Sequence, residues 1–225
     1  MFSPFLYQFI SLDVPPLLTA MFASMSCALL GNFLVLRRLS LMGDAISHAV
    51  LPGIVLAFLI SGSRVGFAVF AGAALAGILT AVLIEAVRSF GKLESGASMG
   101  VVFSIMFAAG VLMIEQAAAR NIDLDADCIL HGQLETIFWF PPEKIGSLFT
   151  LQTLFLLPGE VISSALIFLG CLGFIVLFFK ELSVSSFDPA LATSLGFNAN
   201  FMHYLLMIFM AAAVVASFEA VGSIL

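Results

Sequence analysis

Two residues with metal-binding chemistry stand one helical turn apart near the start of an apolar segment. Asp44 and His48 are spaced i, i+4, so on a helix both side chains project from the same face. A carboxylate and a neutral imidazole are ligands that manganese, iron and zinc accept. Ionisable residues beside an apolar span are costly and indicate a functional site. On spacing alone the structural alternative is favoured, with Asp44 capping a helix and bonding His48, because two ligands do not complete a metal site.

A proline follows this pair by one turn. Pro52 and Gly53 continue the same segment, and a proline removes one backbone hydrogen bond from a helix and frees a carbonyl group. Broken helices near a substrate path are common in transporters. A simple kink is the more common explanation of a proline taken by itself.

Other candidate ligands are less specific. One segment, 115–160, holds seven acidic residues against two basic ones, and is interpreted as a solvated acidic loop or as a surface that collects metal transiently. Glu219 lies in an apolar stretch, either facing a pathway or near the outer interface. His203 is expected to pack at the end of a span. The candidates in the acidic segment are Asp123, Asp125, Asp127, Cys128 and His131.

The elements that position these residues must be membrane helices. Of the 225 residues, 62% are hydrophobic and 10% are charged, against about 25% charged in soluble domains. A soluble enzyme and a disordered chain are therefore excluded. The net charge of −6, with eight Lys and Arg, excludes a nucleic-acid partner. Cys27, Cys128 and Cys171 lie far apart, so neither a zinc ribbon nor a disulfide framework is indicated.

Six charge-free stretches are long enough to cross the membrane, which takes about 20 apolar residues. Backbone groups in lipid must pair with one another, which predicts helices and an all-α polytopic membrane protein with one domain over 1–225. A shorter apolar stretch, 145–159, is expected to form an interfacial or re-entrant helix. The first residues lack a basic region, so we expect no cleaved signal peptide. The predicted spans are 14–36, 45–63, 65–84, 95–114, 161–179 and 195–218.

The distribution of basic residues predicts the orientation. With the N-terminus outside, five of the eight Lys and Arg lie in inner loops, as the positive-inside rule prefers. The acidic loop 115–160 then faces outward, where it would concentrate cations. In the inner connection 181–200, Asp188 suits a helix cap, Pro189 the first helical position and Gly196 a stop. This short amphipathic helix would dock a partner or serve as a plain linker.

The segment around Asp44 also carries a family resemblance. The run VLRRLSLMGDAISHAVLPGIVLAFL resembles, nearly residue for residue, the signature of the permease subunits of ABC importers for zinc, manganese and iron. Segments 94–112, 123–134, 178–198 and 213–225 are similar to the same family in the same order. The outer segment 135–160 is similar only loosely, and its role stays open.

The resemblance implies a permease of the type II ABC importer kind in the bacterial cytoplasmic (inner) membrane. Such a subunit pairs with a second copy or a homologous permease and receives its metal from an extracytoplasmic metal-binding protein. It binds no permanent cofactor and is not itself an enzyme, because a separate ABC ATPase hydrolyses ATP. The chain indeed has no GxxxxGK[ST] phosphate loop, and Gly91 with Lys92 lacks the rest of that motif.

The resemblance also assigns residues. Asp44 and His48 fall on the family's metal-coordinating pair, and two permeases would bring four such ligands together. The neighbouring Gly43, Ser47, Pro52 and Gly53 would shape the pathway. The family's chains cross the membrane again after the span in which this one stops, so we expect a C-terminal truncation at Leu225. The segment that docks on the ATPase falls on Phe187, Asp188, Pro189 and Ala192, with Gly196 following.

Two other functions remain open at this point. An ion-coupled secondary metal transporter typically carries more acidic residues within its spans and internal repeats than this chain does. A membrane-embedded assembly factor would use Asp44 and His48 only structurally. The sequence does not distinguish manganese, zinc and iron, and the lack of paired thiolates disfavours copper.

Overall fold

The chain is a bundle of helices. The computed structural model describes residues 7–61, 67–119, 134, 137–140 and 157–221, and those ranges contain no β-strand. Six helical segments are long and apolar enough to cross a membrane, which confirms the predicted all-α polytopic fold. Most of the proposed interfacial helix 145–159 lies outside the described residues. The elements are η1 (Phe9–Asp13), α2 (Val14–Leu36), α3 (Met42–Ala49), α4 (Leu51–Ser61), α5 (Phe67–Gly91), α6 (Ser95–Ala119), α9 (Gly159–Phe187), α10 (Pro189–Ser194) and α11 (Ala199–Val221).

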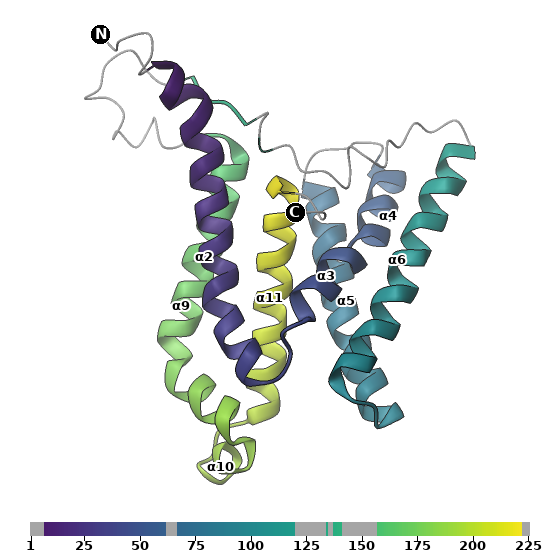
Figure 1. The fold of residues 1–225 in the computed structure, drawn as a ribbon, viewed down its shortest axis with the longest axis vertical. Helices are drawn as coiled ribbons and strands as arrows, with labels where there is room; N and C mark the ends of the chain where they lie inside the picture. The colour runs from purple at the N-terminus through teal and green to yellow at the C-terminus, as the bar shows by residue number, and fades with distance from the viewer. Residues whose placement is uncertain (1–6, 62–66, 120–133, 135–136, 141–156, 222–225) are drawn as a thin grey trace.

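Helix α11 forms the centre of the bundle. It packs against α2 and α9 on one side and against α3 and α5 on the other, and it appears in yellow between these groups in Figure 1. Its buried residues include Leu206, Met207, Ala211, Ala213 and Val215, and one stripe that holds Phe201, Tyr204 and Ile208 stays exposed. A helix that is apolar all round belongs inside a bundle.

The outer helices present apolar side chains to their surroundings. Leu166, Leu169, Val176 and Leu177 of α9 are all exposed, and α6 exposes its own apolar face in the same way. A contiguous apolar surface of this kind is unfavourable in water and suits contact with lipid chains.

Two helices run further than the charge-free stretches predicted. Helix α5 continues past Glu85 and Arg88 to Gly91. Helix α9 bends at Phe178, whose backbone angles are not helical (φ −109°, ψ 19°), and then continues to Phe187. Thus the first residues of the expected connection 181–200 are helical. A charge ends an apolar span but does not break a helix, whereas the residue before a proline is disfavoured in helical geometry. Helix α9 therefore ends only at Phe187, one residue before Asp188 and Pro189.

The second membrane-spanning segment, Met42–Ser61, is interrupted at Val50. Pro52 has no N–H group to donate to the carbonyl oxygen of His48. The next donor, the N–H of Gly53, bonds to the carbonyl of Val50 at 3.0 Å. The segment is thereby divided into α3 and α4, which run at an angle to each other (Figure 1). Val50 keeps right-handed helical backbone angles (φ −73°, ψ −24°), so the structure shows the simple kink that is the more common effect of a proline.

Helix α10 has the caps that the sequence predicts. The Asp188 side chain accepts hydrogen bonds from the N–H groups of Ala190 and Leu191, and Pro189 occupies the first turn. At the other end Gly196 adopts φ +87°, and the N–H of Phe197 bonds to the carbonyl of Ala192 at 2.9 Å. This pairing is a Schellman motif, whose left-handed position favours glycine.

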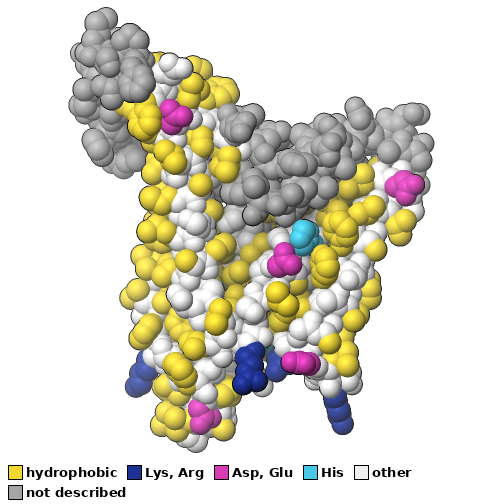
Figure 2. All heavy atoms as spheres, in the orientation of Figure 1, with side chains coloured by type: hydrophobic (Ala, Val, Ile, Leu, Met, Phe, Trp, Pro, Cys, Tyr) yellow, Lys and Arg dark blue, Asp and Glu magenta, His cyan; other side chains and the backbone are white. Residues whose placement is uncertain are grey.

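The basic residues gather at one end of the bundle, which we call the α10 end. It comprises α10, the α2–α3 loop (37–41), the α5–α6 loop (92–94) and the adjoining ends of α5, α9 and α11, and it lies at the bottom of Figure 1. The dark blue side chains in Figure 2 lie at the same end. All Lys and Arg among the described residues belong to it: Arg37, Arg38, Arg88, Lys92 and Lys180.

Helices α4 and α5 are held together by a close backbone approach. A Cβ atom on Gly53 would collide with the carbonyl oxygen of Gly72, and one on Gly72 would lie 2.7 Å from the carbonyl oxygen of Gly53. Small residues allow such contacts between membrane helices, where packing replaces the hydrophobic effect as the driving force. The side chain of Ala76 closes the same contact.

Substitution of Gly53 by alanine is expected to destabilise the bundle. Overpacking of a tight contact costs about 1–3 kcal/mol, and here the clashing atoms include backbone. Gly100→Ala on α6 is the matched control, because a Cβ there meets no atom within 4 Å. Thermal unfolding in detergent should show a lower midpoint for Gly53→Ala and an unchanged or higher one for Gly100→Ala. Equal midpoints for both variants would contradict the close approach.

Candidate functional site

Helix α3 positions the candidate metal ligands. Its buried residues, Met42, Ala45, Ile46 and Ala49, pack against α5, α6 and α11. Asp44 and His48 stand outside this buried set. The short helix lies about midway between the two ends of the bundle, at the interruption of its span (Figure 1). The site thus combines a fixed inner face with an accessible ligand face.

The Asp44 and His48 side chains lie on the same face, as their spacing predicts. The Asp44 Oδ1 and His48 Nε2 atoms are 3.4 Å apart, and the side chains are 70% and 28% exposed respectively. Helix α3 begins at Met42 with Leu41 at the N-cap position, and no side chain caps it. Asp44 is therefore not the cap of this helix, so half of the structural alternative is wrong. Its contact with His48 is present.

Two aromatic residues of α6 contact the His48 ring. The Phe103 centroid lies 5.4 Å from that of His48 with an interplanar angle of 54°, and the Phe107 centroid lies 5.9 Å away at 85°. The two phenyl rings lie beside the imidazole, whose Nε2 atom faces the Asp44 carboxylate. The sequence does not predict these contacts, because an i, i+4 pair of phenylalanines is indistinguishable from ordinary helix packing.

The neighbouring residues have structural roles. The Ser47 hydroxyl donates to the Asp44 backbone carbonyl at 2.8 Å, so it bonds within the helix. A Cβ on Gly43 would meet the tip of Met210, which places α3 close to α11. Pro52 and Gly53 line an apolar groove of about 430 Å³ between α4 and α5. That groove contains no His, Cys, Asp or Glu, so it offers no ligand for a metal.

The described residues of one chain offer two candidate metal ligands. Within the described residues, no group of three or more His, Cys, Asp or Glu side chains is close enough to hold a metal ion. Asp123, Asp125, Asp127, Cys128 and His131 lie outside those residues, as does the side chain of Glu219. The described part of the site is therefore one carboxylate and one imidazole.

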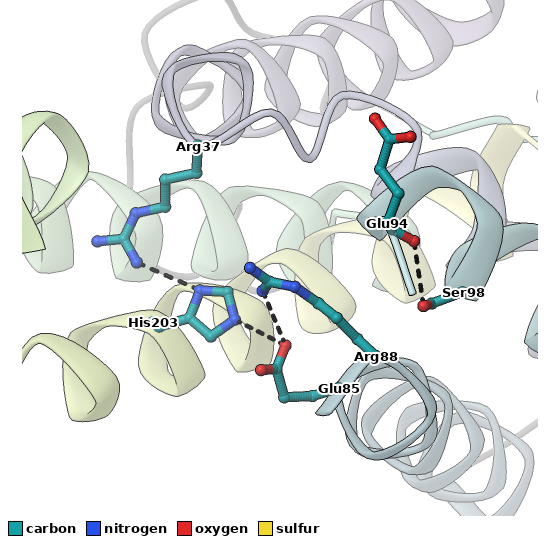
Figure 3. A network of polar contacts seen from close by, with 6 residues as sticks. All are labelled: Arg37, Glu85, Arg88, Glu94, Ser98 and His203. Atoms are coloured by element: carbon teal, nitrogen blue, oxygen red, sulfur yellow. Dashed lines mark hydrogen bonds and ion pairs between the residues drawn. The ribbon is translucent and has the colours of Figure 1, made fainter. Parts of the chain in front are cut away.

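A second carboxylate–imidazole pair lies at the α10 end. The Glu85 Oε2 atom of α5 lies 3.3 Å from His203 Nε2 of α11 and 3.3 Å from Arg88 Nη1. Arg37 Nη1 approaches His203 Nδ1 at 3.4 Å (Figure 3). A guanidinium only donates hydrogen bonds, so Nδ1 accepts and the Nε2–H group donates to Glu85. His203 thus belongs to a polar network, which differs from the packing role that the sequence suggested.

The two pairs differ in their electrostatic surroundings. Glu85 and His203 are 22% and 17% exposed and are flanked by two guanidinium groups, which balance the carboxylate and repel a metal cation. Asp44 is exposed, and among the described residues its side chain contacts no Lys or Arg. The structure therefore leaves Asp44 and His48 free to receive a cation and commits Glu85 and His203 to internal contacts.

The predicted docking segment forms the tip of the α10 end. Phe187 is 75% exposed, and Leu191 and Leu195 are exposed beside it. Ala192 is completely buried, so its side chain packs within the protein and holds α10 in place. Asp188, Pro189 and Gly196 act through the caps of the helix. An exposed apolar tip on a short capped helix is a suitable contact for another protein.

Comparisons with known proteins agree on one family. The model of the ABC 3 transport family matches residues 10–139 and 144–225. The chain is 40% identical over 208 residues to the zinc transport system membrane protein TroD of Treponema pallidum (strain Nichols), covering 92% of this chain and 54% of that protein. It is 37% identical over 207 residues to the manganese transport system membrane protein MntD of Bacillus subtilis (strain 168), covering 92% and 67%. The chain thus spans between half and two thirds of these two relatives.

A solved structure shares the fold. PsaBC from Streptococcus pneumoniae, determined in complex with Fab, superposes with a TM-score of 0.71 at 30% sequence identity. The match covers 100% of this chain and 72% of that chain.

The two carboxylate–imidazole pairs are expected to differ in their effect on stability. Glu85→Ala leaves His203 and Arg88 without their acceptor, and an unsatisfied buried partner costs about 1–3 kcal/mol. Asp44→Ala removes an exposed side chain, so the free energy of unfolding should change by less than about 0.5 kcal/mol. Unfolding in detergent micelles, followed by circular dichroism, measures both. A loss with Asp44→Ala as large as that with Glu85→Ala would make Asp44 a structural residue.

Proposed function

The chain belongs to the ABC 3 transport family, and on that basis we propose that it is the permease subunit of an ATP-driven importer of a divalent transition metal. The observation that carries this proposal is the Asp44–His48 pair on α3. It joins a carboxylate and an imidazole 3.4 Å apart, near the start of a kinked membrane-spanning segment and without a neutralising cation among the described residues. An ionisable pair in that setting is expected to face a pathway.

The proposed substrate is manganese, zinc or iron. Carboxylate and imidazole ligands suit all three ions, and the relatives named above are zinc and manganese transport proteins. Because one chain supplies two described ligands, we propose that a second permease, identical or homologous, supplies two more across a shared pathway. Four ligands from two subunits would bind the ion without a site preformed in either one.

The proposed orientation places the α10 end in the cytoplasm and the N-terminus outside. The grouping of all described Lys and Arg at the α10 end supports it, because basic residues are retained on the cytoplasmic side of the bacterial inner membrane. An extracytoplasmic metal-binding protein would then deliver the ion at the opposite end. A separate ATPase would dock at the α10 end, where Phe187, Leu191 and Leu195 are exposed.

Removal of the Asp44 charge is expected to abolish uptake. Asp44→Asn keeps the shape of the side chain but loses an anionic ligand. Loss of about 1.4 kcal/mol or more in metal binding lowers uptake at least about tenfold. The measurement is ATP-dependent uptake of manganese, zinc and iron by liposomes that contain the permease, its ATPase and its binding protein. Asp13→Asn, the same charge change at an exposed site on η1, is the control and should be silent.

Two outcomes would contradict this proposal. Undiminished uptake by Asp44→Asn would remove the residue from the pathway. Uptake that needs a proton or sodium gradient and no ATP would identify a secondary transporter instead.

Loss of the α10 cap is expected to weaken the ATPase complex. Asp188→Ala removes the acceptor for the Ala190 and Leu191 N–H groups, and loss of such a cap costs about 1 kcal/mol. That loss corresponds to roughly fivefold weaker association if docking requires the folded helix. Asp188→Ser restores a capping oxygen without the charge and should recover binding. Retention of the ATPase by Asp188→Ala at wild-type affinity in detergent would argue against docking through α10.

A further inference from the structure

Arg37 joins two segments that are far apart in the sequence. At the end of α2, its Nε atom donates to the Ser186 hydroxyl at 3.0 Å and its Nη2 atom donates to the Ser185 hydroxyl at 2.7 Å. Both serines are buried in the last two turns of α9. A single guanidinium fork therefore fixes the end of α2 against the end of α9.

The same guanidinium reaches the centre of the bundle. Arg37 Nη1 bonds to His203 Nδ1 of α11, and His203 bonds in turn to Glu85 of α5 (Figure 3). Three different nitrogen atoms of Arg37 thus contact partners on two helices. The guanidinium group is planar and its N–H groups point in fixed directions, so it can donate to these three acceptors at once. A lysine ammonium group cannot replace it in this role.

The two segments joined by Arg37 lead to the two proposed functional regions. Ser186 precedes Asp188, the cap of α10, by two residues. On the other side, Arg37 begins the loop 37–41, which leads directly into α3 with its ligand Asp44. The Arg37 side chain is therefore a bridge between the helix proposed to dock the ATPase and the helix proposed to bind the metal.

The loop between Arg37 and α3 is short and tightly bonded. Arg38 adopts φ +59°, while the Leu39 N–H bonds to the Leu34 carbonyl at 2.8 Å and the Arg38 N–H bonds to the Val35 carbonyl at 3.0 Å. The Met42 N–H then bonds to the Leu39 carbonyl at 2.9 Å. Leu39 is buried. Such a loop transmits a displacement to α3 rather than absorbing it.

We propose that Arg37 is a positioning residue that couples α10 to α3, so that displacement of α10 by the ATPase moves Asp44 and His48. This inference rests on the proposed function, which assigns ATPase docking to α10 and metal binding to α3. The mechanical link itself rests only on the contacts of Arg37. Its role is distinct from docking and from metal binding, because Arg37 belongs to neither α10 nor α3.

Arg37→Gln should uncouple ATP hydrolysis from metal movement. In liposomes with the ATPase and the binding protein, the variant should keep ATP hydrolysis but transport at least tenfold less manganese or zinc per ATP. Arg38→Gln is the matched control: it makes the same charge change one residue later, and the exposed Arg38 side chain has no hydrogen bond or ion pair with the described residues. It should retain the wild-type ratio. The double variant Ser185→Ala with Ser186→Ala removes the acceptors within an intact helix and should resemble Arg37→Gln.

Hydrogen exchange provides a readout that does not depend on transport. In Arg37→Gln, amide exchange should rise at least severalfold in both 37–42 and 182–191, whereas Arg38→Gln should leave 182–191 unchanged. Exchange that rises in the loop alone would overturn the link. Equal falls in transport and ATP hydrolysis, or the same uncoupling by Arg38→Gln, would overturn the coupling role. If the wild type shows no ATP-dependent uptake, the proposed function fails, and exchange at 182–191 still decides whether Arg37 joins the segments.

Discussion

Polar groups inside a bilayer must be satisfied by the protein itself, and the arrangement of this chain follows from that constraint. Buried hydroxyls return to their own helices, as when Thr19 donates to the Pro15 carbonyl and Thr80 to that of Ala76. At the α10 end, the Glu85 carboxylate contacts His203 and Arg88, and His203 also contacts Arg37. The exposed carboxylate of Asp44 departs from this pattern, and for that reason we propose it as a metal ligand.

The two carboxylate–imidazole pairs have the same residue types but different surroundings. Both pairs have suitable donor atoms and similar separations, 3.4 and 3.3 Å. The difference lies in their neighbours: phenyl rings beside His48 and guanidinium groups around Glu85 and His203. A site for a cation needs a carboxylate whose charge is not already balanced by a nearby base. The residues around each pair decide whether its carboxylate meets that condition.

Sequence reasoning succeeded where the rules are local. The caps at Asp188 and Gly196, the i, i+4 face of Asp44 and His48, the interruption near Pro52 and the six apolar spans each depend on a few adjacent residues. It failed for Glu85, Phe103 and Arg37, because their partners lie on other helices and no spacing in the chain reveals them. The predicted ends of α5 and α9 were also wrong. Apolar content indicates which residues lie in lipid, but the helical hydrogen bonds continue beyond those residues.

The central position of α11 has a consequence for how the protein is made. This helix follows every other described span in the chain, yet α2, α3, α5 and α9 all pack against it. During synthesis those helices enter the membrane before their common partner exists. The contacts of α2 with α9 and of α4 with α5 do not involve α11 and can form first. The two groups of helices are joined through α11 only after the ribosome has delivered it, so that step of assembly follows insertion.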